Sequence, residues 1–224
     1  MGIVVEKKQD GFFETLSDGD ITSARFFFDG LSEIYYANGR KLTIPQCGDV
    51  YQRQFGIPFS LDGKLMFYYS WEKGVEAISL ETGVPIWKLR AKHAGRIAVY
   101  DTYIIVIQQE IAVLKVDIAT GEILTRIGCD AERRFDLEGP YQLVDSIRGK
   151  LSVLDTRDMT VRKKYSPLRI NPNRLPSCVI REAKLEGNVL SISGFEERAT
   201  PLGSPFQEPT LFTRVIDENF SEGL

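Results

Sequence analysis

The chain contains one histidine, His93, in the segment Lys92-His93-Ala94-Gly95-Arg96. A Ser-His-Asp triad or a Cys-His pair needs a histidine beside its nucleophile, because the imidazole takes the proton from that group. No Gly-x-Ser-x-Gly motif, which presents the serine nucleophile of many hydrolases, occurs in the sequence. His93 falls in an expected loop between strands, so we favour an ordinary solvated histidine over a catalytic one.

Few residues of the chain are suited to binding a metal ion or a phosphate group. A structural zinc site needs four closely spaced ligands, mostly Cys and His, whereas Cys47, Cys129 and Cys178 are far apart in the chain. The two Gly-Lys pairs, at 63–64 and 149–150, lack the preceding glycine and the following Ser or Thr of a phosphate-binding loop. We therefore expect neither a metal nor a small-molecule cofactor.

Carboxylates are the remaining candidates for catalysis. A glycosidase or lyase would bring two or three of them to one central channel, and the candidates are Glu81, Asp101, Asp117, Glu122, Asp130, Glu132, Asp136 and Glu138. Asp62, Asp101 and Asp145 sit before or within expected turns, where Asp binds local backbone N–H groups. The structural role is favoured, and the enzyme is kept as an alternative.

A repeat in the sequence predicts the strands and turns that would position these residues. Val75-Glu76-Ala77-Ile78-Ser79-Leu80-Glu81-Thr82-Gly83 returns as Val113-Leu114-Lys115-Val116-Asp117-Ile118-Ala119-Thr120-Gly121, 38 positions later. Each copy is an alternating strand, a Thr-Gly turn and a second short apolar strand, which is the pattern of a β-hairpin. Hairpins that recur at this period are typical of propeller blades.

Five such units are expected, with centres near residues 35, 75, 112, 152 and 192. The pattern predicts an all-β fold, a small β-propeller of about five four-stranded blades in one domain over residues 1–224. Asn38-Gly39 predicts a hairpin with a type I′ turn between Glu33–Tyr36 and Lys41–Ile44. An open β-sandwich of hairpins is the alternative.

Two further features concern the N-terminal strand and the turn of the fourth unit. We hypothesise that the N-terminal strand Ile3–Glu6 completes the last blade by adding to its edge. The Thr-Gly turn is replaced in the fourth unit by Asp158-Met159, while Asp155 lies 38 positions after Asp117.

The segments 77–87 and 113–124 resemble the repeat of quinoprotein-like β-propellers and, more generally, of WD-repeat-like propellers. In that family a tryptophan four positions after the Thr-Gly glycine docks between neighbouring blades, and Trp87 stands at that place. The equivalent position after Gly121 is Thr125. The resemblance implies the fold but not quinone chemistry, because the residues that bind the cofactor and its calcium ion are not found.

Composition narrows the range of partners. The formal net charge of −3 disfavours a nucleic-acid-coating protein. No apolar run approaches the roughly 20 residues that span a bilayer, and the start of the chain lacks a signal-peptide layout. The odd number of cysteines fits a reducing compartment. We expect a soluble, cytoplasmic protein.

A propeller places the loops between second and third strands on one rim, together with the loops that lead to the next blade. A rigid scaffold with loops of this kind is suited to binding proteins. The rim would also carry Asn38, Arg40, Arg90, Lys92 and Gln109, and we expect partner-binding residues at Trp71, Glu72, Lys73, His93, Glu110, Asp130, Glu132, Arg133, Arg134, Arg148 and Arg174.

The function expected from these features is non-catalytic protein binding. In its acidic, single-domain, leaderless character the chain is similar to bacterial immunity proteins, which neutralise a cognate toxin by covering its active site. Charge complementarity would then raise the association rate. A propeller glycosidase or lyase and a general assembly scaffold are the alternatives.

Overall fold

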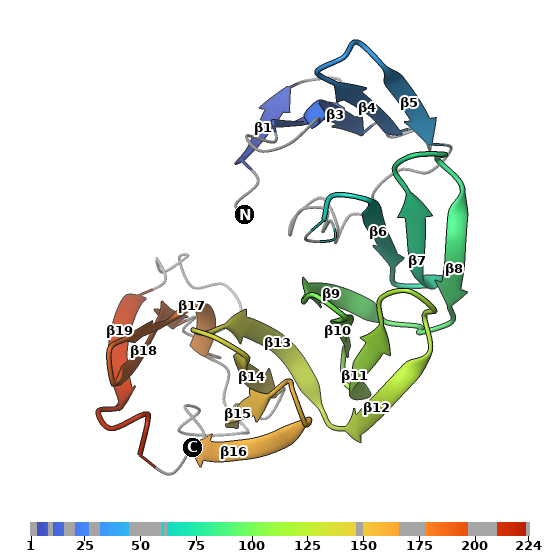
Figure 1. The fold of residues 1–224 in the computed structure, drawn as a ribbon. Coiled ribbons are helices and arrows are strands. Elements are labelled where there is room, and N and C mark those ends of the chain that lie inside the picture. Colours follow the sequence, from blue (N-terminus) through green and yellow to red (C-terminus); the bar gives the residue numbers. More distant parts are fainter. Residues whose placement is uncertain are drawn as a thin grey trace, which may run out of the picture. The chain divides into compact units, whose positions relative to one another are not determined.

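The structure is a computed structural model, and it describes residues 4–8, 11–15, 21–26, 32–44, 60, 62–146, 150–165, 178–196 and 210–222. Among these residues every regular element is a β-strand, and the strands form five antiparallel sheets (Figure 1). The all-β fold with five repeating units is therefore as the sequence predicts.

The sheets follow the chain in order. The first contains β1 (Val4–Lys8), β2 (Gly11–Thr15), β3 (Ile21–Phe26), β4 (Ser32–Tyr36) and β5 (Lys41–Ile44). The second contains β6 (Leu65–Ser70), β7 (Gly74–Ser79) and β8 (Pro85–Leu89). The third contains β9 (Ala94–Val99), β10 (Tyr103–Gln108), β11 (Ala112–Asp117) and β12 (Ile123–Gly128). The fourth contains β13 (Ala131–Asp136), β14 (Tyr141–Ser146), β15 (Leu151–Asp155) and β16 (Thr160–Tyr165). The fifth contains β17 (Cys178–Glu186), β18 (Val189–Glu196) and β19 (Thr210–Asp217).

The chain divides into two compact units, each described by itself below. Unit 1 comprises residues 1–109 and 113–126, and unit 2 comprises residues 110–112 and 127–224. The apolar core of unit 1 includes Ile34, Ile44, Met66, Ile78 and Leu80. That of unit 2 includes Leu143, Leu151, Val153, Ile180, Leu190, Ile192 and Phe220.

The 38-residue period is present in the backbone hydrogen bonds. The amide of Leu80 donates to the carbonyl of Lys64 (2.8 Å), that of Ile118 to Thr102 (3.1 Å) and that of Thr156 to Pro140 (3.0 Å). Donors and acceptors both recur at intervals of 38 positions. The repeat read from two segments of sequence thus extends structurally over three sheets.

The turn that follows β7, β11 and β15 repeats as well. Ser79, Asp117 and Asp155 each accept a hydrogen bond from the backbone amide two residues further on. Four residues after each of them, Gly83, Gly121 and Met159 adopt a positive φ of 75°, 75° and 61°. The fourth unit therefore keeps the turn geometry without its glycine, and Met159 bears the steric cost of this conformation.

Trp87 docks on the neighbouring sheet, as the propeller resemblance implies. Its indole N–H donates to the carbonyl of Ile118 at 3.0 Å. A Cβ atom on Gly121 would lie 2.6 Å from the Trp87 ring, so only glycine fits beneath it. One sheet earlier, the Tyr36 hydroxyl donates to the carbonyl of Leu80 at 2.6 Å, which is the position equivalent to Ile118. Successive sheets of unit 1 are thus joined at the same point of the repeat.

The fifth sheet has one apolar and one polar face. Ile180, Leu190 and Ile192 belong to the core of unit 2. The alternate residues, among them Lys184, Ser191 and Thr213, line a shallow pocket of about 120 Å³ on the other face. The β14 and β15 strands are instead buried on both faces. Alternation of this kind is typical of a sheet with one solvated face.

The hypothesis for the N-terminal strand is wrong. Strand β1 pairs antiparallel with β2, from Val4 opposite Thr15 to Lys8 opposite Gly11, and so belongs to the first sheet. Strand β2 itself was not expected from the sequence. A local hairpin is entropically cheaper to close than a pairing between chain ends.

The extra strands also change the assignment of the Asn38-Gly39 turn. The turn joins the last two strands of its sheet, and Arg40 donates to the carbonyl of Leu80 at 3.3 Å. Asn38 and Arg40 therefore belong with the turns that follow β7, β11 and β15, not with the expected binding rim. Only Gly39 has a positive φ (81°), so the type I′ turn is wrong although the hairpin is confirmed.

Candidate partner-binding surface

The turn after β6 and the connection after β8 are pressed together in unit 1. Gly74 has a φ of 97°, and a Cβ atom there would lie 2.1 Å from the carbonyl oxygen of Leu89. The backbone amide of His93 donates to the carbonyl of Trp71 at 2.6 Å. The sequence predicts that the turns within a blade and the connections between blades lie at one edge, and the turn after β6 and the connection after β8 do lie together.

Trp71 and His93 form the centre of this region. Their rings are stacked, with centroids 4.3 Å apart and planes 10° from parallel, and both side chains are half-buried. His93 has a φ of 65°, which few non-glycine residues adopt. Its carbonyl accepts a hydrogen bond from Gln109 at 2.9 Å. Strained backbone held by several contacts is common at functional sites.

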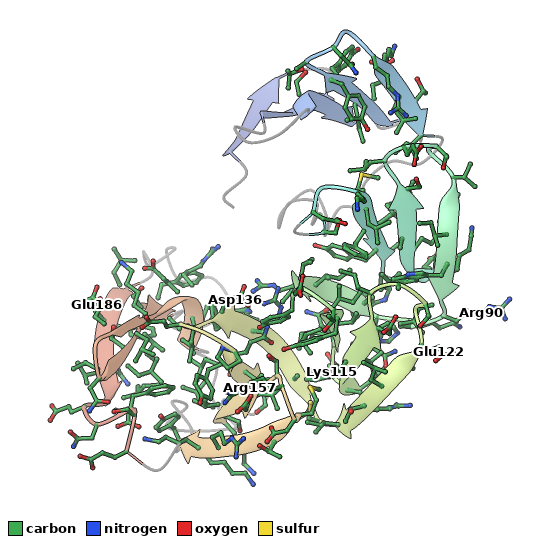
Figure 2. All side chains as sticks on the ribbon, viewed as in Figure 1. Arg90, Lys115, Glu122, Asp136, Arg157 and Glu186 are labelled. Atoms are coloured by element: carbon green, nitrogen blue, oxygen red, sulfur yellow. The ribbon has the colours of Figure 1, made fainter. Side chains whose placement is uncertain are left out.

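Charged side chains surround the stacked pair. Glu72 and Lys73 are exposed in the turn, and Arg90 and Lys92 are exposed in the connection. Arg90 projects outward beyond the end of β8 (Figure 2). The carbonyl of Lys92 is held by Gln108 at 2.9 Å. We call the residues Trp71, Glu72, Lys73, Arg90, Lys92 and His93 the Trp71–His93 surface.

The same relationship between loops occurs in unit 2. The amide of Glu110 donates to the carbonyl of Ala131 at 2.8 Å, and that of Cys129 donates to Ile111 at 3.2 Å. Glu110 is exposed with a φ of 63°, and Asp130 is half-buried beside Ala131. Two of the three described non-glycine residues with positive φ, His93 and Glu110, are thus candidate binding residues.

The segment from Asp130 to Glu138 is not the solvated loop that its charges suggest. Residues 131–136 form strand β13, in which Arg134 is 8 % exposed and forms an ion pair with Asp136. The prediction that Arg134 is an exposed partner-binding residue is therefore wrong. Arg133 is half-buried and donates to the carbonyl of Ile180 at 3.4 Å.

Three other candidates are not placed by the structure. The side chain of Glu132 is not described, although its backbone lies in β13. Arg148 and Arg174 lie outside the described residues. The structure brings Trp71, Glu72, Lys73 and His93 together in unit 1, and places Glu110 near Asp130 in unit 2. It adds Arg90 and Lys92, which the sequence places on the rim without marking them as binding residues.

Several carboxylates have structural roles. Asp117 accepts hydrogen bonds from the amides of Thr120 and Ala119, and these bonds lower the pKa of its carboxyl, although burial opposes them. Asp62 accepts from Ser60 and Lys64, and its pKa is lowered for the same reason. This is the turn-capping role expected for such residues.

Asp155 lies at the centre of a charged cluster in unit 2. Its side chain is fully buried and its Oδ2 lies 2.7 Å from Arg157 and 2.9 Å from Arg162. Hydrogen bonds from Arg157 and Arg162 hold the pKa of the carboxyl well below its ordinary value, against the effect of burial. The cluster fixes the turn between β15 and β16.

The described residues contain no group of three or more His, Cys, Asp or Glu residues that could hold a metal ion. They also contain no helix with the length and apolar character needed to cross a membrane.

Comparison with solved structures shows the class of fold. BamB from Moraxella catarrhalis, a quinoprotein-like propeller, is similar over 86 % of this chain and 66 % of its own, with a TM-score of 0.58 and 13 % identity. The β-propeller domain of Cps50 (Swd1) from Myceliophteria thermophila covers 93 % of this chain and 72 % of its own, with a TM-score of 0.53 and 14 % identity. The computationally designed Ika8 protein is similar over 86 % and 68 %, with a TM-score of 0.57 and 9 % identity.

These likenesses show that the chain has a β-propeller fold. This chain spans 66 % of the length of the BamB chain that it matches. No protein-family model matches the sequence, and comparison with curated proteins gives no match.

Proposed function

We propose that this chain is a non-catalytic protein-binding propeller whose partner contacts the edge that carries the Trp71–His93 surface. The observation that carries the proposal is the stacked Trp71–His93 pair. It is held in place by the positive φ of His93, by the hydrogen bond from the His93 amide to the Trp71 carbonyl, and by the hydrogen bond from the Gln109 amide to the His93 carbonyl. Preorganised aromatic side chains make good anchors, because little conformational freedom is lost when a partner binds.

The finer proposal is that the partner is a cognate toxin whose active site this protein occludes. It is supported by the acidic character of the chain, and a location in the cytoplasm would accompany it. A general assembly scaffold shares the same binding edge but has several weaker partners. A propeller glycosidase or lyase is less favoured, because two of its candidate carboxylates have structural roles: Asp117 caps a turn and Asp136 forms an ion pair with Arg134.

The test is affinity capture from the source cells with three baits. They are the unmodified chain, a Trp71→Ala/His93→Ala variant, and a Glu81→Ala/Thr82→Ala variant altered in the exposed turn between β7 and β8. The proposal expects one protein retained in a one-to-one complex by the first and third baits and lost with the second. Equal recovery on all three baits would contradict it.

Neutralisation is tested with the captured protein itself. Its expression alone should arrest growth if it is a toxin, and co-expression of this chain should relieve the arrest. Relief that survives Trp71→Ala/His93→Ala would place the inhibitory surface elsewhere. Absence of any arrest would favour the assembly scaffold.

A further inference from the structure

The Trp71–His93 surface carries an excess of positive charge. Lys73, Arg90 and Lys92 are all exposed, and Glu72 is the one carboxylate in these two segments. The whole chain has a formal net charge of −3. The surface therefore has the opposite sign to the protein that carries it.

Among the described residues, these three cations differ from many others in having no ion pair. Within the part of the chain that the structure describes, no carboxylate is paired with Lys73, Arg90 or Lys92. By contrast, ion pairs hold Lys41, Lys64, Lys88, Arg157, Arg162, Lys163 and Lys184. A partner that pairs with the three cations would not have to break existing ion pairs.

The backbone beneath the cations is fixed. Gly74 lies against Leu89, Trp71 is hydrogen-bonded to His93, and Gln108 holds the carbonyl of Lys92. The cations therefore project from two segments that contact each other, around a stacked aromatic pair. Charges that are arranged before binding steer an oppositely charged partner and raise its association rate.

We propose that the Trp71–His93 surface binds an acidic segment of a partner protein, with carboxylates facing Lys73, Arg90 and Lys92 and an apolar group packed on Trp71. This inference rests on the proposed protein-binding function and specifies the chemistry of the partner. A single-stranded nucleic acid would offer the same charge with bases to stack, and the oligonucleotide probe in the experiment below distinguishes it from an acidic protein segment.

The experiment uses the purified full chain and synthetic probes. The acidic probe is a peptide of alternating glutamate and leucine, and its neutral counterpart has glutamine for every glutamate. A thymidine oligonucleotide of equal charge is the third probe. Binding is followed by titration calorimetry and by tryptophan fluorescence, to which Trp71 and Trp87 both contribute. The ionic strength is about 0.01 M, where the Debye length is roughly 30 Å and screening is weak.

We expect the acidic peptide to bind at least tenfold more tightly than the neutral one, and this difference to shrink as salt is added. Lys73→Gln/Lys92→Gln should abolish the difference. Lys64→Gln/Lys184→Gln removes the same charge elsewhere and should preserve it. Equal loss with both variants, equal binding of both peptides, or tighter binding of the oligonucleotide would overturn the inference.

The two proposals fail separately. If the capture experiment retains a partner through Trp71 and His93 but the acidic peptide shows no preference, the protein-binding function stands and the acidic chemistry is wrong. If capture is insensitive to Trp71 and His93, both are wrong.

Discussion

The indole ring of Trp71 lies stacked on the imidazole of His93, with ring centroids 4.3 Å apart. The two residues are separated by a complete hairpin in the chain, and a hydrogen bond between their backbones fixes their approach. Stacking of this kind contributes about 0.5–1.5 kcal/mol beyond the area that it buries.

A double-mutant cycle measures the stacking directly. Trp71→Ala, His93→Ala and the double variant should give a coupling free energy of about 0.5–1.5 kcal/mol in urea unfolding. His93→Gly should be more stable than His93→Ala by about 1 kcal/mol, because glycine accepts the positive φ at position 93 without strain. Additive losses would show that the rings do not interact.

Gly121→Ala tests the joint between neighbouring sheets. The new methyl group would face the Trp87 ring at 2.6 Å, and alanine disfavours the φ of 75°. We expect a loss of about 2 kcal/mol or more in the free energy of unfolding. Gly128→Ala is the matched control, since nothing lies within 4 Å of its added Cβ. Similar stability of the two variants would argue against Trp87 docking.

Asp155 predicts a dependence of stability on pH. Its pKa is lowered in the folded chain, so the unfolded chain binds the proton more tightly. The contribution of Asp155 to the free energy of unfolding should therefore be fully present above the ordinary carboxyl pKa of about 4. It should be lost progressively as the pH drops below that value.

Asp155→Asn isolates this contribution. At neutral pH we expect a loss of about 3 kcal/mol, because Arg157 and Arg162 lose their buried partner. The difference between the unmodified chain and the variant should narrow at acid pH. A difference that stays constant from pH 7 to pH 3 would show that Asp155 is not the titrating group.

Phe220 anchors the C-terminal segment to unit 2. Its side chain is 2 % exposed, its ring meets Tyr141 edge-on at 6.0 Å, and its amide donates to Asn188 at 2.8 Å. Phe220→Ala should cost about 3–5 kcal/mol in the free energy of unfolding. Leu211→Ala, at a side chain 81 % exposed, should cost little. Comparable effects would show that Phe220 is not part of the core.

The sequence predicts the repeat because turn chemistry is local. The backbone amides of the two turns donate to side chains within the same turn, Ser79 in one and Asp117 in the other. The spacing of these residues and of the two Thr-Gly pairs therefore predicts the blades. The Trp87 joint follows from the same pattern, since its acceptor, Ile118, belongs to the next copy. Met159 keeps the turn without the glycine, which shows that tertiary contacts can override local preference.

The errors arise where pairing or burial depends on distant residues. Strand β1 has only two apolar residues, Val4 and Val5, and nothing in its own residues identifies the strand with which it pairs. Strand β2 lies between the turn dipeptides Asp10-Gly11 and Asp18-Gly19, but its five residues are too few to predict its pairing. The charges of residues 130–138 suggest a loop, but the carboxylate of Asp136 allows Arg134 to be buried. Trp71 and His93 are both predicted as binding residues, yet their stacking requires the three-dimensional approach of two loops.

Hydrogen–deuterium exchange of the captured complex is the most direct test of partner binding at this edge. Comparing the free and bound protein, we expect the partner to slow exchange in segments 70–74 and 89–93 and to leave the turns at 80–84 and 118–122 unchanged. Protection confined to those turns, with segments 70–74 and 89–93 exchanging as in the free protein, would contradict the account.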